Sequence, residues 1–311
     1  MKKALVIGAS GGMGYAIVNE LTSRGIKVNA FARNQEKLER LFQHDSKVTI
    51  KKGDAFDCES LMVAAEGVDV IFQASNIPYY QWEKELPKLT AIILEVTKAQ
   101  SAKLAVVDNI YAYGKTNQQK VTEATSKSPN TKKGKVRLSV EKKIKQSGVS
   151  AVVAHFPDFY GPNAENTLIH YTLTSVINNK KAMFVGNQKL GREFIFTPDG
   201  AKAIVELAMC EEAYGQNWNI PGYGVITGEE MIAEIRTITN YNKPVSTVTK
   251  NMIRFLGLFN RMMREAVEMY YLNEDPVVLS GEKYENEFGL VPATSYQEGL
   301  KQTIDYMAIT K

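Results

Sequence analysis

Short apolar runs without polar alternation recur through the first half of the chain. Runs of this kind are typical of strands that are buried on both faces of a parallel sheet. The strand candidates are residues 3–8, 27–32, 48–53, 69–74, 103–109 and 150–156. Helical periodicity lies between them, with apolar residues on one face of 13–24 and a broad apolar stripe through 86–100. This alternation predicts an α/β fold with a Rossmann-type doubly wound parallel sheet and right-handed crossovers.

After about residue 160 the pattern becomes mainly helical. Helical segments are predicted at residues 167–179, 198–211, 228–239, 250–271 and 294–308. Short strand-like pieces lie between them at 192–196 and 216–220. We therefore predict a doubly wound domain at 1–160 and a smaller, mainly helical lobe at 161–311 that is partly interwoven with it. The polar run at 116–135 is the longest candidate loop, and its length indicates a mobile or functional segment and not a plain connector.

Three glycines between the first predicted strand and the first helix have the spacing of a phosphate-binding turn. Gly8 would make the tight turn, Gly11 would let the backbone approach a pyrophosphate, and Gly14 would let helix and strand pack closely. The helix that follows offers free N–H groups and the positive end of its dipole. The predicted cradle consists of Gly8, Ser10, Gly11, Gly12, Met13 and Gly14. A glycine-rich turn without a ligand is the alternative.

The end of the second strand bears on which dinucleotide is bound. Folds that use NAD often carry an acidic residue there, about 20 residues beyond the glycines, for the ribose 2′-hydroxyl. This chain has Arg33, whose guanidinium would bind a 2′-phosphate, so NADP(H) is favoured and NAD(H) stays open. A solvated strand end is the alternative for Arg33. The ends of the next two strands complete the predicted cofactor site with Asp54, Ala55, Ala74, Ser75 and Asn76.

These motifs together resemble a known family. The glycine turn, Gly53-Asp54, "ASN" at 74–76, "IYAYG" at 110–114 and "FYGPN" at 159–163 are similar to those of the extended short-chain dehydrogenase/reductases, the NAD-dependent epimerase/dehydratase group. A further stretch, 191–204, resembles a family segment whose arginine contacts the diphosphate of a sugar nucleotide. The resemblance makes Arg192 a candidate anion ligand, with a surface salt bridge as the alternative.

The chain departs from this family at the pair that moves protons. The family pattern Tyr-x-x-x-Lys-x-x-x-Glu, anchored on Glu141, places Arg137 at the lysine and Lys133 at the tyrosine. Tyr111 falls near the position of the family's Ser or Thr. The candidate catalytic residues are therefore Tyr111, Lys133 and Arg137, with Tyr111 or Lys133 as proton donor or oxyanion contact and Arg137 as a ribose ligand. The alternative is a cluster that binds cofactor and substrate and catalyses nothing.

Aromatic residues cluster at the predicted carboxyl ends of strands, where α/β sheets bind ligands. We predict that Tyr79, Tyr113 and Tyr160 line a substrate site for an apolar or ring-shaped molecule, and aromatics that merely pack between lobes are the alternative. The run at 252–272 is rich in Met, Phe and Leu, and three interpretations are open: a lid, a dimer face or a buried helix pair. We take the buried pair as the default.

Composition excludes several other classes of protein. A net charge of +4 without a basic stripe argues against nucleic-acid binding. Cys58 and Cys210 fit neither a disulfide framework nor a metal site, and the three histidines lack ligand spacing, so no metal is expected. No segment reaches the length of a membrane span. We expect a cytoplasmic protein that binds a small-molecule substrate, with no nucleic-acid or membrane partner and with a homodimer left open.

The sequence thus predicts an NAD(P)(H)-binding oxidoreductase whose lobe at 161–311 binds the substrate. We expect NADPH-dependent reduction of a small carbonyl or enone. One alternative is a non-catalytic regulator that senses NADP(H). The other is a nucleotide-sugar epimerase or dehydratase, which the missing tyrosine disfavours because oxidation of a sugar hydroxyl normally uses it as the base.

Overall fold

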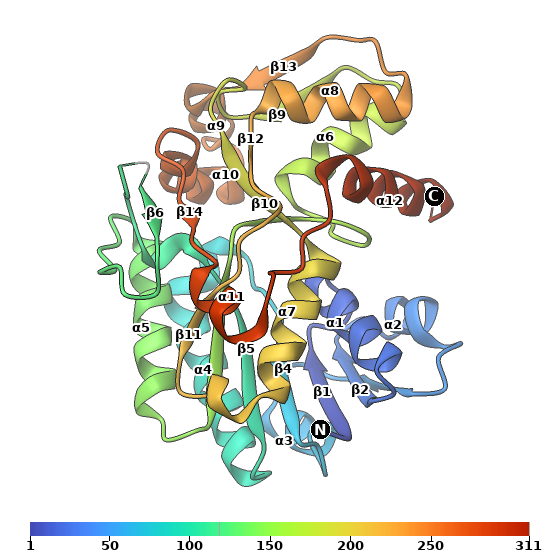
Figure 1. Cartoon of the computed structure of the whole chain (residues 1–311), viewed down its shortest axis with the longest axis vertical. Coiled ribbons are helices and arrows are strands. Elements are labelled where there is room, and N and C mark those ends of the chain that lie inside the picture. The colour runs from blue at the N-terminus through green and yellow to red at the C-terminus, as the bar shows by residue number, and fades with distance from the viewer. Residues whose placement is uncertain (118, 311) are drawn as a thin grey trace.

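A seven-stranded parallel sheet forms the body of the molecule in the computed structural model, which describes residues 1–117 and 119–310 (Figure 1). The strand order is β3-β2-β1-β4-β5-β7-β11. The strands are β1 (Lys3–Ile7), β2 (Lys27–Ala32), β3 (Val48–Lys52), β4 (Val70–Gln73), β5 (Lys103–Asn109), β7 (Ala151–Phe156) and β11 (Asn217–Asn219). The doubly wound parallel sheet predicted from the sequence is therefore confirmed.

Helices cover both faces of this sheet. One face carries α1 (Gly12–Ser23), α2 (Gln35–Phe42) and α7 (Thr197–Met209), and the other carries α3 (Cys58–Ala64), α4 (Trp82–Ala99) and α5 (Lys132–Gln146). Side chains of β1 alternate between the two layers: Ala4 and Val6 join the first core, and Leu5 and Ile7 join the second. Burial on both faces explains why the strands are apolar throughout.

A second lobe lies beyond the carboxyl end of β7 and above the sheet in Figure 1. Its strands form a three-stranded and a two-stranded sheet and its helices pack around them. The strands are β8 (Asp158–Tyr160), β10 (Arg192–Phe196), β12 (Val225–Ile226), β9 (Ala182–Val185) and β13 (Val245–Val248), and the helices are α6 (Leu168–Ile177), α8 (Gly228–Thr239) and α12 (Tyr296–Ile309). Because α7 and β11 return to the main sheet, the second half of the chain contributes to both parts. The domain boundary after residue 160 stays a prediction.

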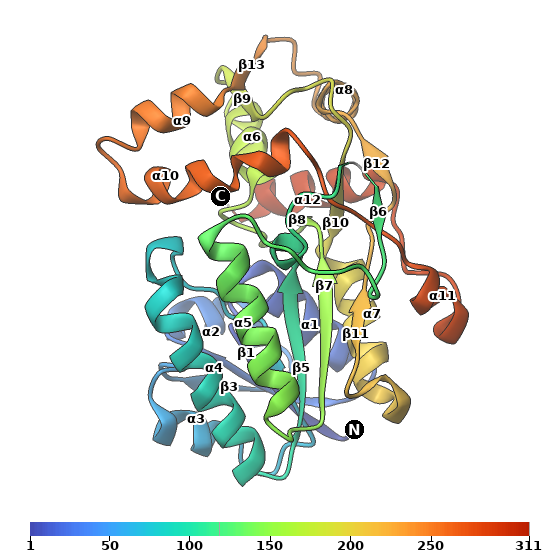
Figure 2. The same ribbon diagram turned by 90° about the vertical axis from the view of Figure 1, so that its left-hand side faces the viewer.

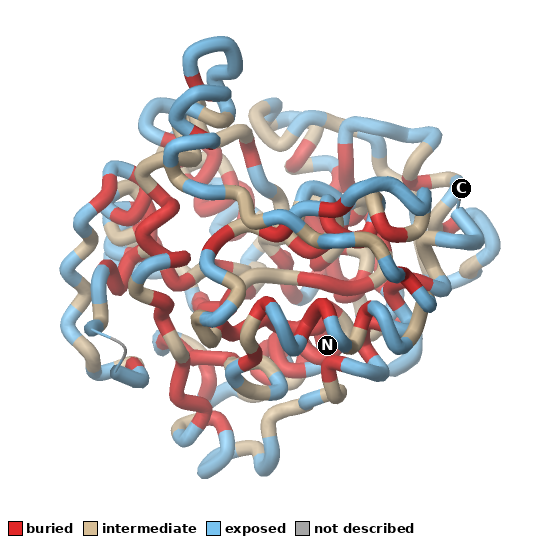
Figure 3. The backbone as a smooth tube through the Cα atoms, turned by 90° about the horizontal axis from the view of Figure 1, so that it is seen from above, coloured by how far each residue is buried: buried red, intermediate tan, exposed pale blue. Residues whose placement is uncertain are grey.

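The region predicted as one helix at 250–271 differs from expectation. It breaks into α9 (Lys250–Leu256), α10 (Arg261–Ala266) and the 3₁₀ helix η4 (Val267–Asn273). The side chain of Asn260 accepts hydrogen bonds from the N–H groups of Met262 and Met263 and so starts a new helix. Figure 2 shows α9 and α10 projecting from the body, and this hairpin is mostly exposed (Figure 3). The default of a buried helix pair is therefore wrong for α9 and α10.

The polar run at 116–135 contains ordered structure. Its strand β6 (Lys120–Val121) pairs with β14 (Val278–Leu279), and the Thr131 side chain caps α5. Gln118, inside this run, and Lys311, the last residue of the predicted second domain, lie outside the described residues. The remaining elements are the 3₁₀ helices η1 (Tyr79–Gln81), η2 (Ile110–Ala112) and η3 (Glu211–Ala213) and the helix α11 (Glu282–Phe288).

Cys58 and Cys210 are half-buried free thiols, and the Cys210 thiol donates a hydrogen bond to Glu212 at 3.0 Å. Across the described part of the chain, every helix is too short or too polar to cross a membrane.

Candidate active site

The glycine turn between β1 and α1 is shaped by close backbone contacts. Gly8 has a φ of +83°, and a Cβ there would lie 2.6 Å from the Cα of Ser75 at the end of β4. A Cβ on Gly14 would overlap the carbonyl oxygen of Gly8, and one on Gly12 would lie 2.6 Å from the Cα of Ala164. At exposed Gly11 a Cβ would meet only the Gly8 carbonyl oxygen, at 3.4 Å. The turn is therefore closed by protein on three sides and open at Gly11.

The start of α1 is suited to bind an anion. Gly11 is the N-cap, no side chain caps the helix, and its first turn has no acidic residue. The first N–H groups and the positive dipole end therefore meet no competing side-chain acceptor. Met13 is buried, and Ser10 accepts a hydrogen bond from the Asn163 amide through its carbonyl oxygen, at 3.1 Å. The glycine cradle and the open helix end fit the pyrophosphate of a dinucleotide.

The other predicted cofactor residues lie at the ends of the neighbouring strands. Arg33 is exposed, and among the described residues no carboxylate lies within ion-pair distance of it. Lys37, one turn further along, forms an ion pair with Glu165 at 2.8 Å. The carboxylate of exposed Asp54 accepts the N–H of Phe56 at 3.1 Å, next to half-buried Ala55.

The stretch after β4 borders the glycine turn directly. The Ala74 N–H donates to the carbonyl of Ile7 at the end of β1, at 3.0 Å. The Ser75 hydroxyl donates to the Gln73 side chain at 3.0 Å, and Asn76 is exposed. Ala74 and Ser75 therefore lie beside the glycine cradle, and their role in binding a dinucleotide stays a prediction.

A cluster of two phenols and two cations lies at the ends of the neighbouring strands β4 and β5. Tyr111 of η2 and Tyr79 of η1 share a hydrogen bond of 2.6 Å between their hydroxyls. The Tyr111 ring stacks on Trp82, with 6.0 Å between ring centroids. The Arg137 guanidinium lies over the same indole at 4.3 Å, and the Lys133 ammonium lies 5.6 Å from the Tyr79 ring centroid. The structure thus brings all three predicted catalytic residues together.

Both cations of this cluster are buried and have carboxylate partners. Arg137 lies 3.2 Å from Asp108 of β5, and its Nε is buried without a hydrogen-bond partner. Lys133 forms two ion pairs of 2.6 Å, with Glu265 of α10 and Glu268 of η4. Lys133 is therefore not a free ammonium, because α10 and the η4 segment that follows it supply its two carboxylate partners.

Burial controls the titration of the two phenols. Loss of hydration raises the pKa of Tyr111 well above its usual value of about 10, and the neighbouring Tyr79 and Asp158 raise it further. Burial likewise raises the pKa of Tyr79 to about 12, although the hydrogen bond with Tyr111 opposes the shift. Both hydroxyls are therefore protonated near neutral pH and act as hydrogen-bond donors, not as bases.

A second buried network lies behind this cluster. Glu141 contacts Lys127 and His155 and accepts a hydrogen bond from the Asn217 amide at 2.7 Å. Burial opposes ionisation of Glu141, but His155 and Lys127 lower its pKa far below the usual range. Glu141, His155 and Asp108 are close enough to share a metal ion, yet the Lys127 ammonium already contacts His155 Nε2, at 2.9 Å. The Lys127 ammonium therefore supplies positive charge where a metal ion would otherwise bind.

The predicted substrate residues separate into different surroundings. Half-buried Tyr79 belongs to the phenol cluster, but Tyr113 is buried and donates to the Asn219 side chain at 2.7 Å. Tyr160 is buried in the lobe between Phe196 and Tyr296. The structure therefore gathers only one of these three tyrosines at the strand ends next to Tyr111.

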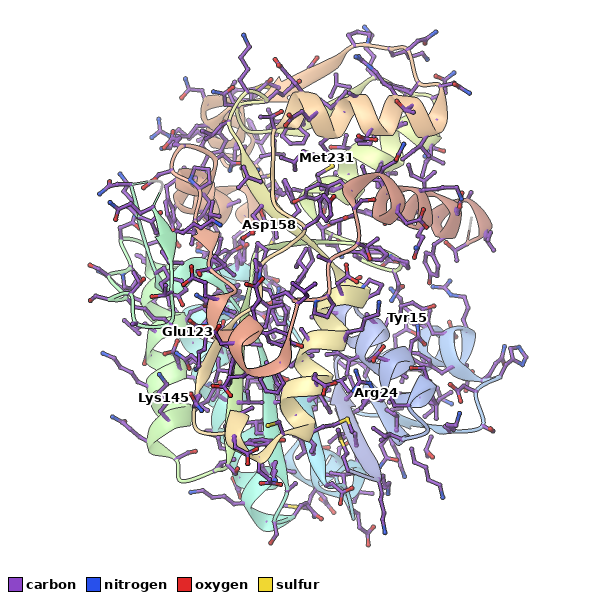
Figure 4. All side chains as sticks on the ribbon, viewed as in Figure 1. Tyr15, Arg24, Glu123, Lys145, Asp158 and Met231 are labelled. Atoms are coloured by element: carbon purple, nitrogen blue, oxygen red, sulfur yellow. The ribbon has the colours of Figure 1, made fainter. Side chains whose placement is uncertain are left out.

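Arg192 is neither exposed nor unpaired. It is 4% exposed, binds Asp158, and donates to the Asn273 side chain and the Val185 carbonyl. Figure 4 shows Asp158 between the sheet and the upper lobe. The alternative of a surface salt bridge is excluded by this burial, because β10 is the middle strand of its three-stranded sheet. Any role as an anion ligand stays a prediction.

Sequence reasoning did not find four residues that shape the cluster. Asp108 is a buried polar residue directly after the apolar run 104–107 of β5, a signal that predicts a buried partner. Glu265 and Glu268 are three residues apart and so share a helical face, but nothing local connects them with Lys133. The Trp82 indole is the surface over which the Arg137 guanidinium lies.

Short sequence matches to oxidoreductases exist among the curated proteins. An uncharacterized oxidoreductase of Schizosaccharomyces pombe is 42% identical over 71 residues, and oxidoreductase ptaF of Pestalotiopsis fici is 37% identical over 76 residues. The matches cover 21% and 23% of this chain and span only 21% and 29% of those relatives. They do not extend over a whole protein of either kind.

Solved structures match almost the whole chain. The dTDP-glucose 4,6-dehydratase of Bacillus anthracis, in complex with NAD, has a TM-score of 0.81 and 20% identity over 100% of this chain and 98% of its own. The UDP-glucuronic acid 4-epimerase of Bacillus cereus, also with NAD, has a TM-score of 0.80 and 17% identity over 99% of both chains. At these identities the likeness establishes the fold alone.

The sequence model of the NAD(P)H-binding family matches residues 8–168, just over half of the chain. The match begins at the glycine turn and ends where α6 begins, so it includes the cradle, the phenol cluster and α5. This chain belongs to the NAD(P)H-binding family, and its fold is that of the extended short-chain dehydrogenase/reductases.

Proposed function

We propose that this protein is an NADPH-dependent reductase of a small, largely apolar carbonyl compound or enone. The observation that carries the proposal is the Tyr79–Tyr111 phenol pair, 2.6 Å between hydroxyls, beside Arg137 and at the strand ends next to the glycine cradle. A nucleotide-binding turn beside a protonated phenol is an arrangement that can support reduction of a carbonyl. The oxidoreductase names of the short sequence matches agree with this reaction class.

The cofactor half of the site follows from the cradle. Gly11 and the start of α1 would hold the pyrophosphate, and Asp54 would accept from the adenine amino group. Arg33, exposed and without a carboxylate partner among the described residues, would bind the 2′-phosphate and so favour NADPH over NADH. When bound, the reduced nicotinamide supplies the hydride. Arg137, with its buried Nε unpartnered, would donate to a ribose hydroxyl or to the substrate.

The proton half of the site is assigned to Tyr111. Its hydroxyl would donate a proton to the substrate oxygen as negative charge develops there. The hydroxyl of Tyr79 would then return a proton to Tyr111 and regain one from water. A phenol of raised pKa is a poor base but remains a donor over a wide pH range. This property suits reduction better than the alcohol oxidation that begins a sugar epimerisation. Lys133, held by Glu265 and Glu268, is a positioning residue that fixes α5 against η4.

The test is NADPH oxidation by the purified protein, followed at 340 nm, with a panel of carbonyl and enone substrates. We expect turnover with an apolar member of the panel and a fall of about 100-fold in kcat for Tyr111→Phe, with NADPH affinity unchanged. Tyr223→Phe removes a hydroxyl at an exposed tyrosine, 57% accessible, and is the matched control. Tight NADPH binding without turnover on any substrate would contradict the proposal and favour a dinucleotide-sensing regulator.

A further inference from the structure

The α9–α10 hairpin is the most apolar exposed feature in the described part of the chain. The described residues as a whole have fourteen exposed large apolar side chains, and six of these lie within the eleven residues from 252 to 262. They are Met252, Phe255, Leu256, Leu258, Phe259 and Met262. Phe259, at the tip, is 81% exposed and stacks edge-on with Phe255 at 5.8 Å between centroids. Single exposed apolar residues need no explanation, but a concentrated patch indicates a binding surface.

The charge of the same hairpin has one sign. Residues 249–264 contain Lys250, Arg254, Arg261 and Arg264 and no Asp or Glu. Their four positive charges equal the net charge of the whole chain, +4, so the remaining residues balance to zero. Lys250 is offset by Glu274 at 3.1 Å, whereas Arg254, Arg261 and Arg264 are exposed at the periphery of the apolar tip. Apolar side chains flanked by cations match the boundary of an anionic bilayer.

The hairpin is held at a fixed place relative to the rest of the molecule. Arg261 stacks on the Tyr80 ring of η1 at 4.6 Å. Glu265 of α10 and Glu268 of η4 bind buried Lys133. The α10 arm is therefore anchored at the phenol cluster, while α9 and the loop between the two helices project from the body (Figure 2).

We propose that the α9–α10 hairpin docks this protein on an anionic lipid surface, with the tip residues Phe255, Leu258 and Phe259 in the interface and Arg254, Arg261 and Arg264 at the headgroups. A second copy of the chain is disfavoured as occupant, because a two-fold contact through this patch would bring the same arginines together. The sequence analysis expects no membrane partner, and the exposed hairpin is our reason to propose one. The inference is independent of the proposed reductase activity.

The test is co-sedimentation of the full-length protein with vesicles of phosphatidylcholine alone or with about 30 mol% phosphatidylglycerol. We expect binding to the anionic vesicles, at least tenfold weaker binding to the neutral ones, and a marked loss in about 0.5 M salt. The double variant Leu258→Ser/Phe259→Ser should lower the partition coefficient at least tenfold. Arg254→Glu should lower it by about fivefold or more.

Two matched variants and one further measurement decide the outcome. Leu290→Ser removes an apolar side chain that is 88% exposed outside the hairpin, and Lys84→Glu reverses a charge there, so both should leave vesicle binding unchanged. Sedimentation velocity of the wild type and of the Leu258→Ser/Phe259→Ser variant reports self-association. Absence of anionic-vesicle binding, equal loss in the matched variants, or a dimer that the double variant dissolves would each overturn the proposal.

Discussion

The glycine cradle and the phenol–cation cluster lie at neighbouring strand ends and are built in opposite ways. The cradle comes from one turn, residues 8–14, and its shape is set by backbone atoms, with distant close approaches at Ser75 and Ala164. The cluster is assembled from η1, η2, α5 and the α10–η4 segment, which lie far apart in the chain. One is a local property of the chain and the other exists only in the folded protein.

The two regions also depend on different forces. Steric limits define the cradle, since a side chain at Gly8, Gly12 or Gly14 would overlap backbone atoms. Electrostatics define the cluster, because Lys133 and Arg137 are buried charges that need Glu265, Glu268 and Asp108. We therefore expect substitutions in the cradle to separate stability from cofactor binding, and substitutions in the cluster to couple them.

The largest effect is expected where Lys133 loses both carboxylates. In Glu265→Gln/Glu268→Gln the ammonium, whose side chain is 4% exposed, has no remaining charge partner. We expect a loss of about 3 kcal/mol in the free energy of unfolding, near the lower end for a broken buried pair because both glutamates are partly hydrated. Urea denaturation measures it. Adding Lys133→Met should recover part of the loss, and Glu206→Gln, at an exposed pair with Arg24, should cost under about 1 kcal/mol.

Substitutions in the cradle should give the next largest effect on the free energy of unfolding. They should also separate stability from cofactor binding more clearly. A Cβ at Gly14 overlaps the Gly8 carbonyl, so Gly14→Ala should lower the free energy of unfolding by about 2–3 kcal/mol. Gly11→Ala should leave it within about 0.5 kcal/mol, since that side of the turn is open. The same Gly11 variant should weaken NADPH binding at least tenfold, measured by nucleotide fluorescence. Equal losses of stability in the two variants would show that the open side has been misassigned.

The contrast explains what could be predicted from the sequence. The strands and the glycine turn are encoded by residues close together, so their apolar runs and glycine spacing were sufficient to predict them. The Lys133 ion pairs join residues more than 130 positions apart, and no pattern along the chain relates such groups. The sequence placed Tyr111, Lys133 and Arg137 together only through the family resemblance, which says nothing of what neutralises the cations.

The buried helix pair predicted for 252–272 and the surface salt bridge considered for Arg192 were wrong for more local reasons. The Met-, Phe- and Leu-rich composition of 252–272 predicted a buried helix pair, but most apolar side chains of α9 and of the loop after it are exposed. Asn is a common N-cap residue, and the Asn260 side chain starts α10 within this stretch. The sequence left two roles open for Arg192, an anion ligand or a partner in a surface salt bridge. Arginine is rarely buried without partners, and the sequence does not show that Asp158 and Asn273 bind it.

A smaller effect is expected on the preference for NADPH over NADH, which we assign to Arg33 at the end of β2. Arg33→Ala should raise the Kd for NADPH by about ten- to thirtyfold, since one charge-assisted contact with a 2′-phosphate is lost, and leave the Kd for NADH within about twofold. Lys37→Ala is the matched control: its ammonium is already paired with Glu165, so both constants should change little. A parallel loss for both dinucleotides in Arg33→Ala would remove the 2′-phosphate assignment.

The smallest expected effect is a rate that does not change with pH. Burial raises the pKa of Tyr111 well above 10, so its hydroxyl remains protonated, and able to donate, at every pH below that value. If Tyr111 is the donor, kcat for reduction should stay level from about pH 6 to about pH 9 and fall only at still higher pH. Because Tyr79 raises the pKa of Tyr111, Tyr79→Phe should move that alkaline fall to lower pH while the neutral plateau persists. Stopped-flow NADPH oxidation across this range measures both curves. A fall centred between about pH 7 and 8 in the wild type would assign the proton to a different group and separate the phenol pair from the chemistry.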